Sequence, residues 1–233
     1  MTTPYVLAGI FVVISAFLAY FAIKKVFRLA STVLTIVALA LAIVVFGISY
    51  DVQRFQGQLA TDDKLFVLEE DGVLKAAFVH RNQPAPLLLS DLSAEREALV
   101  AGDLKALKGE RALVIITKPA AYANVDAVDI NGNKLPAQTI LAMLAKDDPR
   151  QDYIAEIRRI NNIPPGQEVY MPEVNVNEFK GVLLAALVNE YLHAHSLVQG
   201  VHDGHVRVYP SSITTWVMDT LPYPVLKYIL QVN

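Results

Sequence analysis

Two long apolar stretches open the chain, and a short basic stretch separates them. Residues 5–23 and 29–50 contain no charged side chain, and Lys24, Lys25 and Arg28 lie between them. At about 1.5 Å rise per residue, helices of these lengths span roughly 28 and 33 Å, which matches a hydrocarbon core of about 30 Å. The pattern therefore predicts a transmembrane helical hairpin with helices over about residues 5–23 and 29–50.

The basic connection also predicts the orientation of this hairpin. No acidic residue occurs in the first 50 positions, and short loops that carry Lys and Arg stay on the cytoplasmic side of a membrane. We therefore expect a two-pass protein of the cell membrane, with the N-terminus and the C-terminal domain both extracytoplasmic. A cleaved signal peptide fits less well, because the start of the chain has no basic segment and the first apolar run is longer than a usual signal core.

Small side chains repeat along one face of each predicted span. At seven-residue spacing these include Ala8, Ser15 and Ala22 in the first span and Thr35, Ala42 and Ser49 in the second. Helices in lipid associate where small residues let their backbones approach closely. The pattern predicts that the two helices pack on each other. The faces left over would meet the lipid bilayer, other membrane protein subunits or a second copy of the chain.

After a juxtamembrane linker over residues 51–63, the pattern becomes that of a folded domain over residues 64–233. Lys64–Glu70 and Val73–Val79 are β-prone runs around Asp71-Gly72, a dipeptide suited to a tight hairpin turn. A continuous apolar run over Arg111–Thr117 predicts a buried strand. A second hairpin is expected over Val125–Ile130 and Asn133–Leu135, and a last strand over Val206–Tyr209.

Helical segments alternate with these strands. They are expected over Ser93–Lys108 with a division at Gly102, Ala137–Lys146, Arg150–Ile160 and Val176–Gln199. His80–Pro86 and Asn161–Pro172 are expected to be loops, because proline breaks both segments. The strands and helices together predict an α+β fold, with one mixed extramembrane domain that contains β-hairpins and several helices.

The C-terminal stretch from Ser211 to Val232 has two charges, Asp219 and Lys227, and carries Trp216. It fits either an amphipathic segment at the bilayer or a final core element of the domain. Because the basic residues that would favour anionic lipid are lacking, the core interpretation is favoured.

Composition narrows the classes of function. The chain has 20 basic and 23 acidic residues, and three of the basic ones lie in the hairpin connection, so the domain is acidic. This balance argues against nucleic acid as a partner, because nucleic acid requires a clustered basic surface. Cysteine is absent, so disulfides, thiolate metal sites and cysteine nucleophiles are excluded. A prokaryotic envelope protein has this kind of composition.

One cluster of side chains has metal-binding chemistry. Four of the five histidines fall within 13 residues, beside an acidic residue. Glu190 and His193 are three positions apart and share a helix face, while His202 and His205 flank a turn that could bring them close. Together these four residues could hold a divalent transition metal with a water in an open position, as hydrolysis requires.

The competing interpretation is structural. The spacing of the cluster matches no established zinc signature, and histidine is at home where a buried helix emerges into a turn. A calcium loop around Asn131-Gly132 has the wrong glycine register, which leaves a plain turn. The chain also lacks the Gly-x-Ser-x-Gly and phosphate-loop motifs.

Two classes of function follow. The favoured one is a non-catalytic, membrane-anchored accessory or structural subunit of a membrane protein assembly, with an extracytoplasmic domain for protein–protein interaction and no cofactor. The alternative is a membrane-tethered metal-dependent hydrolase that uses the Glu/His cluster.

Overall fold

The computed structural model describes most of the chain after Asp62. The described residues are 15, 20, 34–36, 39, 50, 57, 62–83, 85–164, 167, 169, 171, 173–194, 197–211 and 213–220. Contacts between Cα atoms divide the chain into two units, Met1–Tyr50 and Asp51–Asn233. The predicted hairpin over residues 5–50 lies almost wholly outside the described residues. Among the residues that are described, no helix combines the length and the apolar character needed to cross a bilayer, so the structure does not support that prediction.

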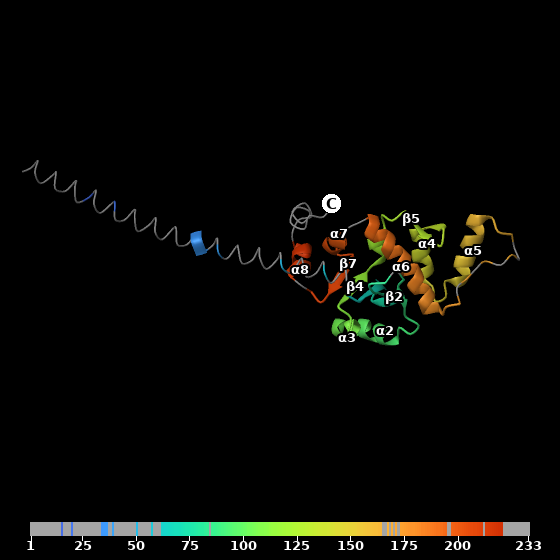
Figure 1. Ribbon diagram of the computed structural model, residues 1–233, viewed down its shortest axis with the longest axis horizontal. Coiled ribbons are helices and arrows are strands. Elements are labelled where there is room, and N and C mark those ends of the chain that lie inside the picture. The colour runs from blue at the N-terminus through green and yellow to red at the C-terminus, as the bar shows by residue number, and fades with distance from the viewer. Residues whose placement is uncertain are drawn as a thin grey trace, which may run out of the picture. The chain divides into compact units, whose positions relative to one another are not determined.

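A five-stranded mixed sheet forms the centre of the second unit (Figure 1). In spatial order it contains β3 (Leu87–Leu88), β2 (Val73–His80), β1 (Lys64–Glu70), β4 (Leu113–Thr117) and β7 (Val206–Tyr209). Strands β1 and β4 are parallel, and the other neighbouring pairs are antiparallel. The first predicted hairpin, the buried strand and the last strand are confirmed, whereas β3 follows the predicted loop His80–Pro86 and was not predicted.

The turn between β1 and β2 shows why the first hairpin could be predicted. Asp71 and Gly72 have φ angles of 52° and 78°, the left-handed conformations that a tight antiparallel turn needs. Because the two strands pair directly, Lys64 lies opposite His80 and Phe66 opposite Phe78. Alternate residues of each strand point to opposite faces, so these four side chains share one face of the sheet.

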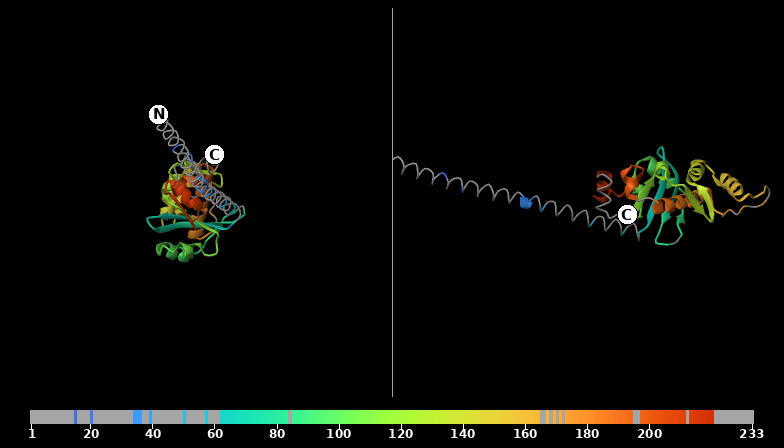
Figure 2. Two further views of the ribbon diagram at one scale, coloured as in Figure 1. Left: turned by 90° about the vertical axis from the view of Figure 1, so that its left-hand side faces the viewer. Right: turned by 90° about the horizontal axis from the view of Figure 1, so that it is seen from above.

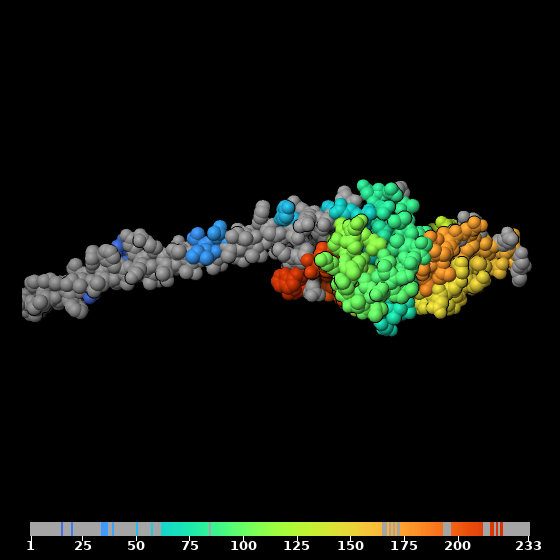
Figure 3. All heavy atoms as spheres, turned by 90° about the horizontal axis from the view of Figure 1, so that it is seen from below, coloured from blue at the N-terminus to red at the C-terminus, as the bar shows by residue number. Residues whose placement is uncertain are grey.

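The opposite face is covered by two short helices, α2 (Ser93–Val100) and α3 (Leu104–Lys108). Figure 2 shows both on one side of the strands, and Figure 3 shows the surface that they form. The helices are divided at Gly102, whose φ angle is 69°, and Asp103 caps α3 by accepting hydrogen bonds from the backbone of Lys105 and Ala106. The predicted division of this helical region is confirmed.

The apolar contacts of this face form one cluster. Its buried members are Leu65, Val67, Leu74, Ala77, Val79, Leu92, Ala98, Leu99, Leu107, Val114 and Ile116. Beside it, Arg111 pairs with Glu95 of α2 at 2.8 Å. The α2–α3 face is therefore held mainly by hydrophobic burial, with an ion pair at α2.

The other face is crossed by the long helix α6 (Val176–Ala194), which Figure 1 shows passing over the strands. A Cβ added to Gly181 would lie 3.0 Å from the backbone oxygen of Ala77 in β2, so glycine permits the close approach of helix and sheet. The prediction of one helix over Val176–Gln199 is wrong at its end. A separate helix, α7 (Leu197–His202), follows α6 and packs on β7 and α8.

The remaining elements lie around α6 and the end of the sheet. They are the 3-10 helix η1 (Pro119–Tyr122), β5 (Ala127–Ile130), β6 (Asn133–Pro136), α4 (Ala137–Ala145), α5 (Arg150–Asn161) and α8 (Ile213–Thr220). Strands β5 and β6 form a separate two-stranded sheet, which confirms the second hairpin, and both predicted proline-led helices are present.

Helix α8 divides its side chains between the interior and the solvent. Thr215 and Met218 are buried, whereas Trp216 is 63% exposed. The C-terminal stretch was predicted to be a core element. That prediction is right for Thr215 and Met218 and wrong for Trp216. Residues 221–233 of the predicted tail lie outside the described residues.

Candidate functional site

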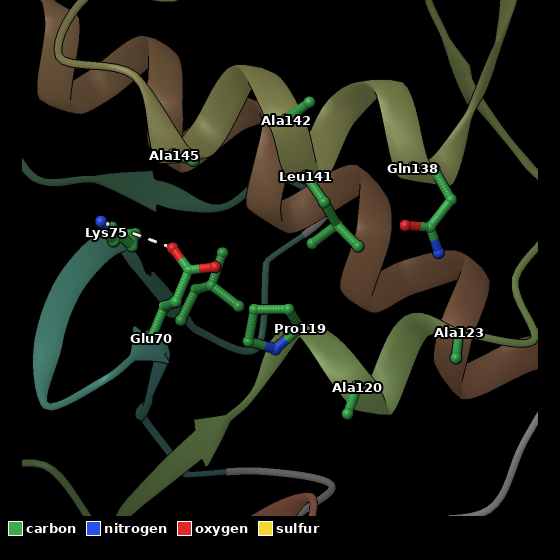
Figure 4. Close-up of a pocket in the computed structure, with 10 residues that line it drawn as sticks. Glu70, Lys75, Pro119, Ala120, Ala123, Gln138, Leu141, Ala142 and Ala145 are labelled. Atoms are coloured by element: carbon green, nitrogen blue, oxygen red, sulfur yellow. Dashed lines mark ion pairs between the residues drawn. The ribbon is translucent and has the colours of Figure 1, made fainter.

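Two cavities adjoin the α6 face of the sheet. The larger, of about 560 Å³, lies between the sheet and the second half of α6 and is named here the Lys64 cavity. The smaller, of about 420 Å³, lies between β1, η1 and α4 and is named the α4 cavity (Figure 4). The described residues that line the Lys64 cavity are Lys64, Phe66, Phe78, His80, Pro86, Ile115, Asp129, Ile130, Asn131, Val182, Ala185, Ala186, Val188, Asn189, Leu192 and Leu197.

The floor of the Lys64 cavity is aromatic. Phe66 of β1 and Phe78 of β2 are cross-strand partners, and their rings stack with centroids 5.1 Å apart and an interplanar angle of 7°. Ile115 of β4 lies beside Phe66 in the parallel register. This floor is flat and apolar because three neighbouring strands contribute large side chains at the same level of the sheet.

Helix α6 forms the roof of the cavity. Val182, Ala185, Ala186 and Asn189 line it, and their spacing places them on one side of the helix. Alanine at the two central positions leaves space between helix and sheet that larger side chains would fill. The roof is therefore apolar along most of its length, with an amide group toward one end.

Lys64 is the most unusual residue of this site. Its side chain is 2% exposed, and its Nζ donates a hydrogen bond of 2.8 Å to the backbone oxygen of Asp62. Among the described residues, no carboxylate lies within ion-pair distance of Nζ; Asp63 instead pairs with Arg81 at 3.1 Å. Burial lowers the pKa of Lys64, and the charges of Asp62 and Asp63 oppose that change. The ammonium group thus has one neutral hydrogen-bond partner, and the charges of Asp62 and Asp63 act on it without an ion pair.

His80 adds a second base at the same end of the cavity. It lies directly opposite Lys64 in the β1–β2 ladder, and its side chain is exposed at the cavity. Burial lowers the pKa of His80 first, and the charge of Lys64 lowers it further. The Lys64 cavity therefore has an apolar body and a basic end.

The register of the first hairpin is a sequence signal for this site. Lys64, Phe66 and Phe78 belong to that hairpin, and the predicted strands alone do not show that these residues and His80 share one face. With the register fixed by the Asp71-Gly72 turn, a lysine and a histidine at the open ends of the strands must lie side by side. His80 is the one histidine that lies outside the 13-residue stretch His193–His205.

The α4 cavity is lined differently. Leu141 of α4 points toward η1 across it (Figure 4), Ala142 and Ala145 also belong to its lining, and its charged groups, Glu70 and Lys75, pair with each other at 3.4 Å. Both charged side chains are partly exposed to solvent. Each of these two charges already has an ionic partner and contact with solvent. The α4 cavity therefore offers a ligand less opportunity for a new hydrogen bond or ion pair than the Lys64 cavity does.

A buried hydrogen-bond chain lies on the same face of the sheet. The hydroxyl of Tyr122 donates to Thr117 Oγ1 at 2.9 Å, and Thr117 Oγ1 donates to the backbone oxygen of Val67 at 3.1 Å. The rings of Tyr122 and Tyr191 meet edge to face at 5.6 Å. Burial raises the pKa of Tyr191 to about 12, so the hydroxyl stays protonated at neutral pH.

The predicted Glu/His cluster is only partly described. Glu190 is half-buried in α6, and the Nδ1 atom of His202 lies 3.3 Å from the backbone oxygen of Met218 in α8. His205 lines a small pocket with Glu69, Lys118 and Arg207, where the two cations oppose a bound metal ion.

The four residues are not brought together by any observation on the described part of the chain. There, no three His, Cys, Asp or Glu side chains are grouped so that they could hold a metal ion. The side chain of His193 lies outside the described residues. A metal site of Glu190, His193, His202 and His205 therefore stays a prediction.

The chemistry of the Lys64 cavity follows from its own lining. An apolar floor and roof can hold an apolar molecule, and the basic end can bind an acceptor or an anion. The described lining residues include no Ser, Thr, Tyr or Cys side chain that could act as a nucleophile.

Comparison with known proteins adds no relative: no protein-family model, curated protein or solved structure matches the chain.

Proposed function

We propose that this protein is a non-catalytic, membrane-anchored envelope protein that works by binding. In this proposal the apolar hairpin over residues 5–50 anchors the chain in the cell membrane, with its N-terminus and its domain outside the cytoplasm. The protein is an accessory subunit of a membrane assembly, and the Lys64 cavity is the binding site of its domain.

One observation carries the binding role. The Lys64 cavity, the larger of the two described above, combines the stacked Phe66–Phe78 floor with the buried ammonium group of Lys64. Binding sites for small molecules are mostly apolar and contain a few polar groups that orient the ligand. The Lys64 cavity has this composition, and its volume of about 560 Å³ lies within the usual range of such sites.

The anchoring and assembly roles are supported by the sequence pattern. Two charge-free stretches of spanning length flank a connection that holds all the basic residues of the first 50 positions. The small residues at seven-residue spacing, such as Ser15 and Ala42, favour close helix packing in lipid.

The first experiment is a native mass measurement on the full chain, extracted from its own membrane in mild detergent. A reproducible species well above 25.6 kDa, with a second protein bound, supports the accessory-subunit role. A single chain that carries one stoichiometric transition metal overturns it, because the Glu/His cluster would then be the functional centre.

The binding role is tested separately by filling the cavity. Ala186→Phe places a large ring in the roof of the Lys64 cavity, and Ala142→Phe does the same in the α4 cavity as a matched control. We expect Ala186→Phe, but not Ala142→Phe, to abolish binding of small apolar molecules by the full chain. Unchanged binding in Ala186→Phe would contradict the proposed site.

A further inference from the structure

We propose that the Lys64 cavity binds a monocarboxylate with an apolar chain, its carboxylate at Lys64 and His80 and its chain over Phe66 and Phe78. This inference rests on the proposed binding function, because it names the class of ligand for the same site.

The first argument is the incomplete bonding of Lys64. An ammonium group has three N–H donors, and the Nζ of Lys64 has one hydrogen bond, to the backbone oxygen of Asp62, among the described residues. The residue is 2% exposed and lines the cavity, so a further acceptor would have to reach Nζ from the cavity. A buried cation is stabilised by an anion at hydrogen-bond distance, and a ligand carboxylate in the cavity would supply one.

The second argument is the position of His80. Its imidazole lines the same cavity, opposite Lys64 across the strand pair. Neutral imidazole donates one N–H and accepts at its other nitrogen. A carboxylate has two oxygens, so it can accept from Lys64 with one and from His80 with the other. Lys64 and His80 are directly paired across the two strands, so their donors lie side by side. Two such donors match the two oxygens of a carboxylate better than they match a single hydroxyl.

The third argument concerns the rest of the ligand. Beyond the basic end, the cavity continues over stacked aromatic rings and under alanines 185 and 186 of α6. Burying apolar surface there favours binding by about 25 cal/mol per Å². A ligand with a small charged head and a long apolar chain therefore complements the shape and the polarity of the cavity.

The fourth argument limits the charge of the ligand near Asp129. Asp129 also lines the cavity, and its Oδ1 atom accepts a hydrogen bond of 2.7 Å from the backbone N–H of Gly132. An anionic group next to Asp129 would be repelled by this carboxylate, so the part of the ligand that lies beside Asp129 should be apolar.

The inference is tested with a pair of probes that differ in charge and share the same chain. Binding of 6-phenylhexanoate and of 6-phenyl-1-hexanol to the full chain in zwitterionic nanodiscs is measured by equilibrium dialysis at neutral pH, and binding to empty nanodiscs is subtracted. We expect the carboxylate to bind at least about tenfold more tightly than the alcohol, as a hydrogen bond to a charged group implies.

Variants assign the preference to the basic end. Lys64→Met keeps the length of the side chain and removes its charge, and we expect it to remove the preference for the carboxylate while the alcohol still binds. Lys75→Met is the matched control, because Lys75 is ion-paired with Glu70 at the α4 cavity; its preference should be unchanged. Circular dichroism checks that each variant is folded.

The outcomes separate the two proposals. Equal binding of both probes to the unmodified chain, or a preference that survives in Lys64→Met, overturns the monocarboxylate inference and leaves the binding function standing. If neither probe binds, or if Ala186→Phe binds both as before, the binding site itself is wrong and the inference falls with it. The probe pair alone decides the inference if Lys64→Met does not fold.

Discussion

The two faces of the central sheet are built from different chemistry. The α2–α3 face is a continuous apolar cluster that includes Leu65, Leu107 and Val114. The α6 face of the same strands buries Lys64, Thr117 and Tyr122 and encloses a cavity. Alternate residues of the same strands thus build an apolar core on one face of the sheet and surround buried polar groups and a cavity on the other face.

The difference has an energetic meaning. Packing of apolar side chains stabilises the fold with no polar group to satisfy, whereas a buried cation lowers stability unless it is well paired. Polar groups that are kept in an interior at the expense of stability occur most often at functional sites. The comparison therefore assigns a mainly stabilising role to the α2–α3 face and supports the proposed binding role of the α6 face.

The largest expected effect is on the α2–α3 face. Leu107 is 1% exposed within the apolar cluster, so Leu107→Ala removes buried methyl groups and leaves a cavity. We expect the free energy of unfolding to fall by about 2–5 kcal/mol, measured by urea denaturation of the full chain in nanodiscs and followed by circular dichroism. Val100→Ala is the control, because Val100 is 72% exposed at the end of α2. If Leu107→Ala and Val100→Ala lowered the free energy of unfolding equally, burial in the apolar cluster would not be what stabilises the α2–α3 face.

The next effect is on the hydrogen-bond chain of the α6 face. Thr117→Val leaves the hydroxyl of Tyr122 without its acceptor and the backbone oxygen of Val67 without its donor. An unsatisfied buried group costs about 1–3 kcal/mol, and we expect a loss of that size in the same denaturation experiment. Adding Tyr122→Phe should recover part of it. If the double variant is as unstable as the sum of the single variants, the two residues do not act as one network.

Lys64→Met provides the most direct contrast between the faces. The substitution replaces a buried ammonium by an apolar side chain of similar length, so we expect the free energy of unfolding to rise by about 1 kcal/mol. Carboxylate binding should be lost in the same variant. Lys75→Met, which breaks a partly exposed ion pair, should change stability by at most about 0.5–1 kcal/mol in either direction. A clear loss of stability in Lys64→Met would show that the lysine is structural.

The sequence allowed the hairpins and most helices to be predicted because their determinants are local. Asp71-Gly72 and Asn131-Gly132 specify tight turns through positive φ angles, and both are found. The break between α6 and α7 was missed, because the run from Val176 to Gln199 contains neither proline nor a glycine near the break. Strand β3 was also missed, because its two residues pair with β2 and have no periodic pattern of their own.

The candidate site was harder to predict than the fold, for a physical reason. Histidines that are close in sequence gave the visible cluster at residues 190–205, yet binding sites form between residues that are close in space. Lys64 and His80 are 16 positions apart and meet through strand pairing. The cavity itself depends on α6 approaching the sheet at Gly181 while Ala185 and Ala186 keep the space open, and no local pattern encodes that combination.

The smallest predicted effect tests the basic end through pH. Because burial and Lys64 lower the pKa of His80, the folded chain binds this proton less readily than the unfolded chain, whose histidine titrates near 6.5. Stability should therefore fall as the pH drops through about 6.5. His80→Gln removes this contribution, so between about pH 7.5 and pH 5.5 the variant should lose slightly less stability than the unmodified chain.

The coupling to Lys64 makes this last test specific. In a Lys64→Met background the neighbouring charge is gone, so the pKa of His80 should move back toward its ordinary value and His80→Gln should change the pH dependence less. Urea denaturation of the four chains at each pH gives the comparison directly. An equal effect of His80→Gln in both backgrounds would mean that the two bases do not influence each other, and the basic end would then be two independent groups. A smaller effect of His80→Gln without Lys64 would show that the bases act together, as recognition of one carboxylate requires.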